Sequence, residues 1–274
     1  MQLLKASYTN IISRAFGKFA TAEFPTPIQN FINRSYVKLL KLDMSEFSPP
    51  HNYKTLNKLF TRAFVKTREI DGASDSVISP TDSFITTSGK IKEDLSLQLK
   101  GFWYSVDDLL TQFIDDKSKK KIYGGEYINF YLSPTDYHRY HMPLDCKIKK
   151  VIHVPGALYP VNFTYLKKMP ELYVKNERVI VECEANGKLF YMILVGALNV
   201  GKMAISFEPD IETNTDSKEI KVYEYDDMNL SKGFELGYFL MGSTVVILFE
   251  KNMIELSCEN DKKIRFGDLV ATMK

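Results

Sequence analysis

The chain has 274 residues, of which 45% are hydrophobic and 26% charged, a composition typical of globular proteins that excludes disordered and low-complexity classes. Its 36 basic and 34 acidic residues give a formal net charge of +2, so we expect no nucleic acid partner. Three widely spaced cysteines without a CxxC pair argue against a disulfide framework and favour a reducing compartment. We expect no transmembrane helix, because no apolar run reaches 18 residues. We also expect no signal peptide, because the N-terminus lacks an uninterrupted apolar stretch and a small-residue cleavage site.

The first 66 residues are basic and have helical periodicity. They contain ten Lys or Arg residues and only three acidic ones. Apolar residues recur at three- and four-residue spacing over residues 4–19, and further helices are predicted over residues 28–42 and 53–65, with prolines between them. Such basic amphipathic helices either cover a protein core or lie in a membrane interface, and the pattern alone leaves both open.

After residue 70 the pattern changes to short strands separated by turn residues. One helix is predicted over residues 105–113, with Ser105 as its N-cap, and residues 213–218 should form a polar loop. We therefore expect an α+β protein, with N-terminal amphipathic helices followed by a mostly antiparallel β-sheet core. The expected division is a helical segment, 1–66, and a β-rich catalytic domain, 67–274. Strands are predicted over residues 76–78, 126–132, 147–153, 178–184, 189–195, 221–225 and 243–249.

Three short segments carry side chains suited to catalysis. Asp82 ends a strand, His138 and His141 lie three residues apart, and the Gly242-Ser243 step opens an apolar strand. Each has an ordinary explanation when taken alone: an Asx-turn, a polar turn and the start of a strand. No metal site is expected, because prolines on both sides of the histidine pair disfavour a helix and the spacing suggests no third ligand. Glycine-rich nucleotide motifs and the GxSxG motif of α/β-hydrolases are absent from the sequence.

In combination, these segments resemble motifs of one enzyme family. The resemblance is to the phosphatidylserine decarboxylases, pyruvoyl-dependent enzymes that make phosphatidylethanolamine, and it covers nearly the whole chain in the correct order. The long matching segments are residues 77–82 (VISPTD), 131–143 (YLSPTDYHRYHMP), 195–201 (VGALNVG) and 232–249 (KGFELGYFLMGSTVVILF). Shorter matches are residues 53–62 with 70–71, and residues 154–156, 161–162 and 176–179.

The resemblance implies that the chain is a proenzyme that cuts itself between Gly242 and Ser243. In this autocatalytic serinolysis the Ser243 hydroxyl attacks the Gly242 carbonyl, with His141 as base and Asp82 orienting it. The products are residues 1–242 and residues 243–274, and Ser243 becomes a covalent pyruvoyl group, the cofactor. That group forms a Schiff base with the substrate amine and accepts electrons as CO2 leaves. The resemblance also assigns proton donation or electrostatic aid to His138.

The same resemblance changes the expectation for the N-terminal segment. With phosphatidylserine as substrate, a basic helical segment would hold the enzyme on an anionic membrane surface, which predicts a peripheral protein on the cytoplasmic face of the cell membrane. Arg178 is a weak candidate for binding the lipid phosphate, with a structural ion pair as the equal alternative. The partners are then the membrane and the two chains of one precursor, and a homodimer is left open.

Two other functions stay open on the sequence. One is a serine hydrolase that uses Ser243, His141 and Asp82 on an external ester. The other is a lipid-binding relative without catalytic activity. Both predict an uncut chain, whereas the decarboxylase predicts two chains.

Overall fold

The computed structural model describes residues 15–92, 96–99, 102–161, 169–198, 202–240 and 243–274. Residues 15–21 are helical, and the named helices are α2 (Thr26–Leu40), α3 (Leu56–Phe60), α4 (Val106–Leu110), α5 (Asp116–Ile122) and α7 (Leu172–Lys175), with a 3-10 turn, η1, at Pro50–Asn52. None of the described helices has the length and apolar character needed to cross a membrane.

Most of the β residues belong to one eight-stranded sheet of order β11-β7-β8-β9-β13-β5-β2-β15, in which every ladder is antiparallel. Two three-stranded sheets, β1-β16-β14 and β10-β12-β6, and the hairpin β3-β4 complete the fold. The strands are β1 (Ser76–Ile78), β2 (Ser83–Lys90), β3 (Ser96–Leu99), β4 (Phe102–Ser105), β5 (Glu126–Leu132), β6 (Arg139–His141), β7 (Cys146–Val154), β8 (Arg178–Ala185), β9 (Lys188–Val195), β10 (Met203–Ile205), β11 (Lys221–Leu230), β12 (Glu235–Phe239), β13 (Ser243–Phe249), β14 (Ile254–Leu256), β15 (Lys262–Ile264) and β16 (Leu269–Met273).

The core lies around the centre of the large sheet. Residues 245–249 of β13 are fully buried, as are residues 190–195 of β9 beside them. A continuous apolar run in a strand is expected where both faces of the sheet are covered. The expectation of a mostly antiparallel β-sheet preceded by helices is confirmed at this level.

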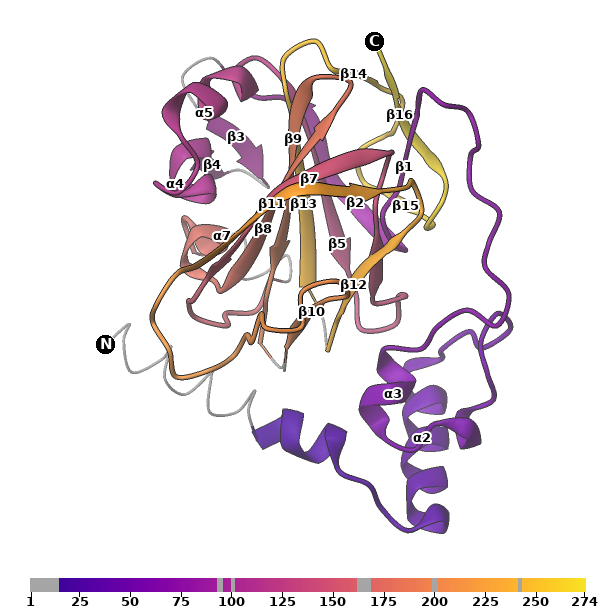
Figure 1. Cartoon of the computed structure of the whole chain (residues 1–274). Helices are drawn as coiled ribbons and strands as arrows, with labels where there is room; N and C mark the ends of the chain where they lie inside the picture. Colours follow the sequence, from indigo (N-terminus) through magenta and orange to yellow (C-terminus); the bar gives the residue numbers. More distant parts are fainter. Residues whose placement is uncertain (1–14, 93–95, 100–101, 162–168, 199–201, 241–242) are drawn as a thin grey trace.

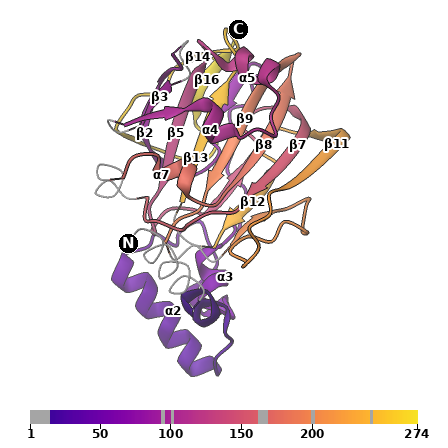
Figure 2. The same cartoon turned by 90° about the vertical axis from the view of Figure 1, so that its left-hand side faces the viewer.

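The N-terminal helices α2 and α3 lie together at one end of the molecule, away from the main sheet (Figures 1 and 2). The predicted helix over 28–42 is confirmed as α2. The predicted helix over 53–65 is wrong in extent, because α3 has five residues and ends at Phe60. The chain then turns so that Phe64 forms a bridge with Phe47, which a continued helix would prevent. Residues 1–14, which hold most of the first predicted helix, lie outside the described residues.

Helix α2 has an unusual orientation, because it buries polar side chains and exposes apolar ones. Asn33 is fully buried and donates from its Nδ2 to the carbonyls of Pro50 and Tyr53, at 2.9 and 2.8 Å. The side chains of Phe31 and Leu39 are 72% and 81% exposed. The apolar residues of α2 therefore fall into two groups: Phe31 and Leu39 are exposed, whereas Ile32 and Val37 pack against the cluster that contains Leu59.

Contacts cross the predicted division at residue 66. The Arg62 guanidinium donates to the Thr135 carbonyl at 3.0 Å, and the Arg139 Nε donates to the Thr61 carbonyl at 2.9 Å. Phe47 and Phe64 pack with Tyr137 and Phe266 in one aromatic cluster. The end of the N-terminal segment thus borders the region where the predicted site residues gather, and the division itself stays a prediction.

Candidate active site

The sheet register brings the three predicted segments to one edge of the large sheet. Ser243 on β13 is paired with Leu132 on β5, and Phe84 on β2 is paired with Tyr131, so Ser83 lies level with Leu132. Neighbouring strands are about 4.8 Å apart, which puts the Ser243 and Ser83 backbones about 10 Å apart. The segment with Asp82, the segment after Leu132 and the Ser243 end of β13 therefore face the same region. Gly242 and the Ser243 side chain lie outside what the structure describes.

The histidine segment continues into β6, in the sheet that leads to the predicted cleavage site. β6 pairs with β12, and the Phe239 backbone N–H donates to the His138 carbonyl at 2.9 Å. The His141 backbone N–H donates to the Pro80 carbonyl at 2.9 Å, which ties this strand to the Asp82 segment. The bond between Gly242 and Ser243 belongs to the connection from β12 to β13, so the chain passes from the histidine sheet directly to the main sheet.

His141 is held by two hydrogen bonds. Its Nδ1 lies 2.9 Å from the Gly233 carbonyl, which can only accept, so Nδ1 carries the proton. Its Nε2 lies 3.0 Å from the Tyr137 hydroxyl and accepts from it. Burial lowers the pKa of His141 to about 4, although the Gly233 carbonyl acts in the opposite direction. The imidazole is therefore neutral at pH 7, with the basic lone pair on Nε2.

The backbone conformation at Gly233 requires a glycine in this loop. Its φ of +79° lies in the left-handed region that L side chains rarely adopt. This conformation belongs to the turn that brings the Gly233 carbonyl to His141. The backbone of Gly233 thus fixes the tautomer and the orientation of the imidazole.

His138 is fully buried and has one ring nitrogen bonded and one free. Its Nδ1 donates to the Asp136 carbonyl at 2.8 Å, and its Nε2 has no hydrogen-bond partner among the described residues. The ring packs against Phe60 of α3, with 4.0 Å between ring centroids. Burial lowers the pKa of His138 to about 3, so this imidazole is also neutral at pH 7. A buried nitrogen without a partner is rare and is expected where a ligand will bind.

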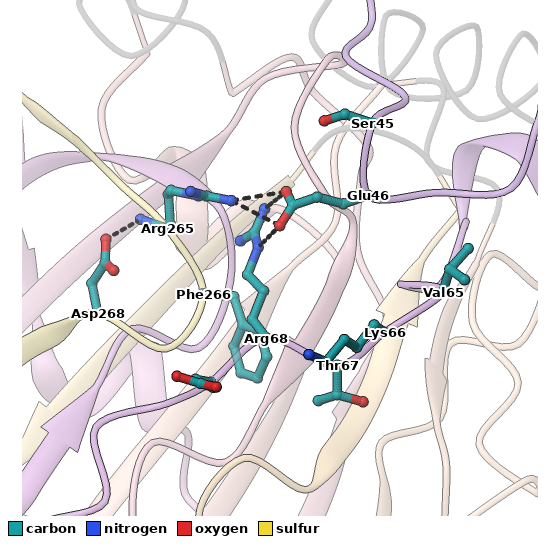
Figure 3. Close-up of a pocket in the computed structure, with 10 residues that line it drawn as sticks. Ser45, Glu46, Val65, Lys66, Thr67, Arg68, Arg265, Phe266 and Asp268 are labelled. Carbon is teal, nitrogen blue, oxygen red and sulfur yellow. Dashed lines mark hydrogen bonds and ion pairs between the residues drawn. The ribbon is translucent and has the colours of Figure 1, made fainter.

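Asp82 contacts arginine rather than histidine. Its carboxylate accepts two hydrogen bonds from the Arg68 guanidinium, which also donates to Glu46 at 2.8 and 2.6 Å. Glu46 in turn accepts from Arg265, at 2.9 and 2.8 Å, as Figure 3 shows. The Arg68 guanidinium holds the pKa of the Glu46 carboxyl below its usual range. Two arginines and two carboxylates thus form one chain of ion pairs, with Asp82 at its inner end.

Asp82 is linked to His141 through Phe266. The Phe266 backbone N–H donates to the Asp82 carboxylate at 2.8 Å, and the Phe266 ring stacks on the His141 imidazole with 3.9 Å between centroids. Both ring nitrogens of His141 are bonded to other groups, so the direct Asp82–His141 hydrogen bond that the resemblance implies is not formed in this structure. Asp82 instead fixes the residue that packs on the imidazole.

Arg178 has structural contacts. The side chain is buried, and its guanidinium donates to the main-chain carbonyls of Leu109, Val174 and Asp108, at 3.0, 2.6 and 2.9 Å. A guanidinium engaged in this way does not point its donors at a lipid phosphate. The contacts favour the structural alternative for Arg178, although its partners are carbonyls rather than a carboxylate.

Sequence reasoning missed several residues of this region. Glu46 lies outside the matching segments, and Phe266 follows the last of them. Arg68 stands directly before the matching residues 70–71, and Tyr137 lies in the histidine segment, but neither has a predicted role. Their positions depend on contacts between distant parts of the chain. A charged residue in an irregular connection, as at Arg68, has no signal of its own that would separate it from a surface residue.

Comparisons with known proteins agree on one family. A family model described as phosphatidylserine decarboxylase matches residues 56–272. A protein named phosphatidylserine decarboxylase proenzyme from Campylobacter jejuni is 39% identical over 97% of this chain and 99% of its own length. Proteins with the same name from Helicobacter pylori and Nitrosospira multiformis are 40% and 36% identical, over 96% and 93% of this chain and 96% and 90% of their own lengths.

Proposed function

The chain belongs to the phosphatidylserine decarboxylase family, and from this we propose that it converts phosphatidylserine into phosphatidylethanolamine and CO2. The observation that carries this function is the match over residues 56–272, together with relatives similar over almost their whole length. The meeting of Asp82, the histidine segment and the start of β13 at one sheet edge supports it, because a single site needs all three.

We further propose that the chain matures by cutting itself between Gly242 and Ser243. The Ser243 hydroxyl attacks the Gly242 carbonyl, converting the peptide bond into an ester and freeing the Ser243 nitrogen as an amine. Elimination then leaves a carboxylate on Gly242 and a dehydroalanine, which takes up water and loses ammonia to become a pyruvoyl group. The ketone of that group, once formed, binds the substrate amine and withdraws electrons as CO2 leaves.

The two histidines suit different steps. His141 has its lone pair on Nε2, so it can take a proton once Tyr137 gives way or relays it. His138 has a buried Nε2 free to interact with the substrate, and its neutral state at pH 7 makes it a base or, once protonated, a strong acid. We assign His141 to self-cleavage, Asp82 to its positioning through Phe266, and His138 to proton transfer during decarboxylation.

Membrane attachment is the third part of the proposal. The apolar side chains of Ile28, Phe31 and Leu39 lie within about 80° of arc on α2 and are 51%, 72% and 81% exposed. A groove of about 710 Å3 runs along this face. The same segment carries the positive charge of the chain. We propose that this face enters the interface of an anionic membrane and places the enzyme on its cytoplasmic side.

The test of the function is a denaturing intact-mass spectrum of the purified protein, followed by an assay of phosphatidylserine turnover. We expect residues 1–242 and a blocked chain 243–274 whose mass fits pyruvoyl in place of serine, and release of CO2. Ser243→Ala should remain one chain without turnover. A whole chain that labels with a fluorophosphonate would point to the hydrolase, and a whole chain that binds lipid alone would point to the inactive relative.

A further inference from the structure

Arg62 is a buried cation whose donors are mostly unused. The side chain is 3% exposed, and only its Nη2 donates, to the carbonyls of Thr135 and Asp136 at 3.0 and 3.4 Å. Its Nε and Nη1 have no hydrogen-bond partner among the described residues. One face of the guanidinium lies over the Phe47 ring, 4.5 Å from the centroid. A buried guanidinium with two free donors is costly to maintain unless an anion completes it.

The cavity beside Arg62 has room for such an anion. It has a volume of about 580 Å3 and is lined by five cationic side chains and four carboxylates. The guanidinium groups of Arg68 and Arg265 in its wall are already paired with Glu46 and Asp82. Arg62 forms no ion pair within the described part of the chain. Burial lowers its pKa, and the more distant carboxylates of Asp82 and Asp136 oppose this only in part.

Arg62 lies close to His138 of the candidate active site on one side and to Tyr36 of α2 on the other. Its Nη2 and the His138 Nδ1 donate to the same Asp136 carbonyl, at 3.4 and 2.8 Å. On the other side, the Tyr36 hydroxyl of α2 is buried and has no hydrogen-bond partner among the residues that the structure describes. Burial raises the pKa of Tyr36 to about 12, and the charge of Arg62 opposes this rise. Tyr36 also lines the apolar groove on the exposed face of α2. Arg62 therefore lies between the groove and His138.

We propose that Arg62 binds the phosphodiester of the lipid headgroup, an assignment that rests on the proposed function. A phosphatidylserine has its phosphate between its acyl chains and its amine, which is the order of groove, Arg62 and His138. The carboxylate of the same headgroup is the less suitable partner. A cation on a carboxylate that must leave as CO2 stabilises the ground state more than the transition state, whereas the phosphate keeps its charge throughout.

The experiment uses mature enzyme with short-chain lipids kept below their micelle concentration. For Arg62→Gln we expect the KM for phosphatidylserine to rise about 10- to 100-fold, the range for loss of a charge-assisted contact, with kcat within about threefold of wild type. The inhibition constant of phosphatidylethanolamine, which lacks the carboxylate, should rise by the same factor. Arg178→Gln, equally buried but bonded to carbonyls, is the matched control and should leave the KM and the inhibition constant unchanged.

Two outcomes would overturn the assignment. Unchanged constants in Arg62→Gln would remove Arg62 from binding, and a rise for phosphatidylserine alone would move it to the carboxylate. If Arg62→Gln does not mature, titrating wild-type enzyme carrying 15N-labelled arginine with phosphatidylethanolamine decides the matter: the Arg62 Nε–H resonance must shift. Absence of CO2 release by wild-type enzyme would instead defeat the proposed function, and the titration would still report on the phosphate.

Discussion

His138 and His141 are kept neutral by burial, and this has a thermodynamic consequence at the scale of the single residue. An unfolded histidine binds a proton near pH 6.5, whereas the pKa values of His138 and His141 are about 3 and 4. Between these values the unfolded chain binds more protons than the native one. The free energy of unfolding must therefore fall as the pH drops through this window and recover as it rises.

The first prediction concerns this pH dependence, measured on the uncut Ser243→Ala chain so that one chain unfolds. From pH 6.5 to pH 4.5 the free energy of unfolding should fall by at most about 1.4 kcal/mol per pH unit for each of the two histidines. Adding His138→Gln to the Ser243→Ala chain should make this decline in the free energy of unfolding shallower. The measurement is urea unfolding at each pH, followed by circular dichroism. An equal slope in His138→Gln would contradict the pKa assigned to it.

The second prediction tests the link from Asp82 to His141 through Phe266. Asp82→Asn weakens charge-assisted hydrogen bonds worth about 1.5–3 kcal/mol, so self-cleavage should slow by about 10- to 100-fold. Phe266→Leu should slow it in the same direction, because the stacked ring is lost. The double variant should be no slower than the slower single one, since both act on one contact. The measurement is the rate at which the chain 243–274 appears; full maturation of Asp82→Asn would refute its role.

The sequence offers candidates for the proposed chemistry, but not the contacts that position them. Asp82, His138 and His141 stand in short segments that combine turn residues with titratable groups, and the match of these segments to one family makes them the candidates. The hydrogen bond from His141 to the Gly233 carbonyl and the stacking of Phe266 join residues far apart in sequence. No local periodicity reports such contacts.

At the scale of the helix and strand, prediction succeeded where an element has a continuous apolar pattern. The strands β1, β5 and β13 have the predicted bounds; β8 and β9 are one residue longer at one end, and β7 is one residue longer at each end. Short strands such as β6, β10 and β15 were missed, because three residues carry no period. β2 was missed for another reason: its Thr and Ser residues resemble a loop, while the ladder to β5 makes it a strand.

The third prediction compares two helix N-caps. Thr55 caps α3 by accepting from the Lys58 backbone N–H at 3.1 Å, and Asp115 caps α5 by accepting from that of Ser118 at 2.9 Å. Alanine at either cap should cost about 1 kcal/mol in urea unfolding of the uncut chain. Only Thr55→Ala should also lower decarboxylation by mature enzyme, because α3 carries Phe60, which packs on His138. Equal effects of both variants on turnover would show that α3 does not support the site.

At the scale of the whole molecule, the charge and the exposed apolar face of α2 lie on the same N-terminal segment. The fourth prediction is that the double variant Phe31→Ser/Leu39→Ser binds anionic vesicles much more weakly in sedimentation, by about tenfold for each side chain removed. Val222→Ser, at an exposed apolar residue on β11, is the control and should bind like wild type. Binding that the double variant retains in full would exclude this face as the membrane contact.

Because β13 lies between β5 and β9, the proposed cut would make unfolding of the enzyme difficult to reverse. Before the cut, the central strand reaches its place as part of one chain, and the rate of folding does not depend on concentration. After the cut, residues 243–274 supply β13 to the large sheet, β15 to its edge and β14 and β16 to another sheet. A mature enzyme that unfolds loses this piece to solution and must regain it in a bimolecular encounter. The uncut precursor thus folds in a unimolecular reaction, and the lifetime of the mature enzyme is set by its rate of unfolding.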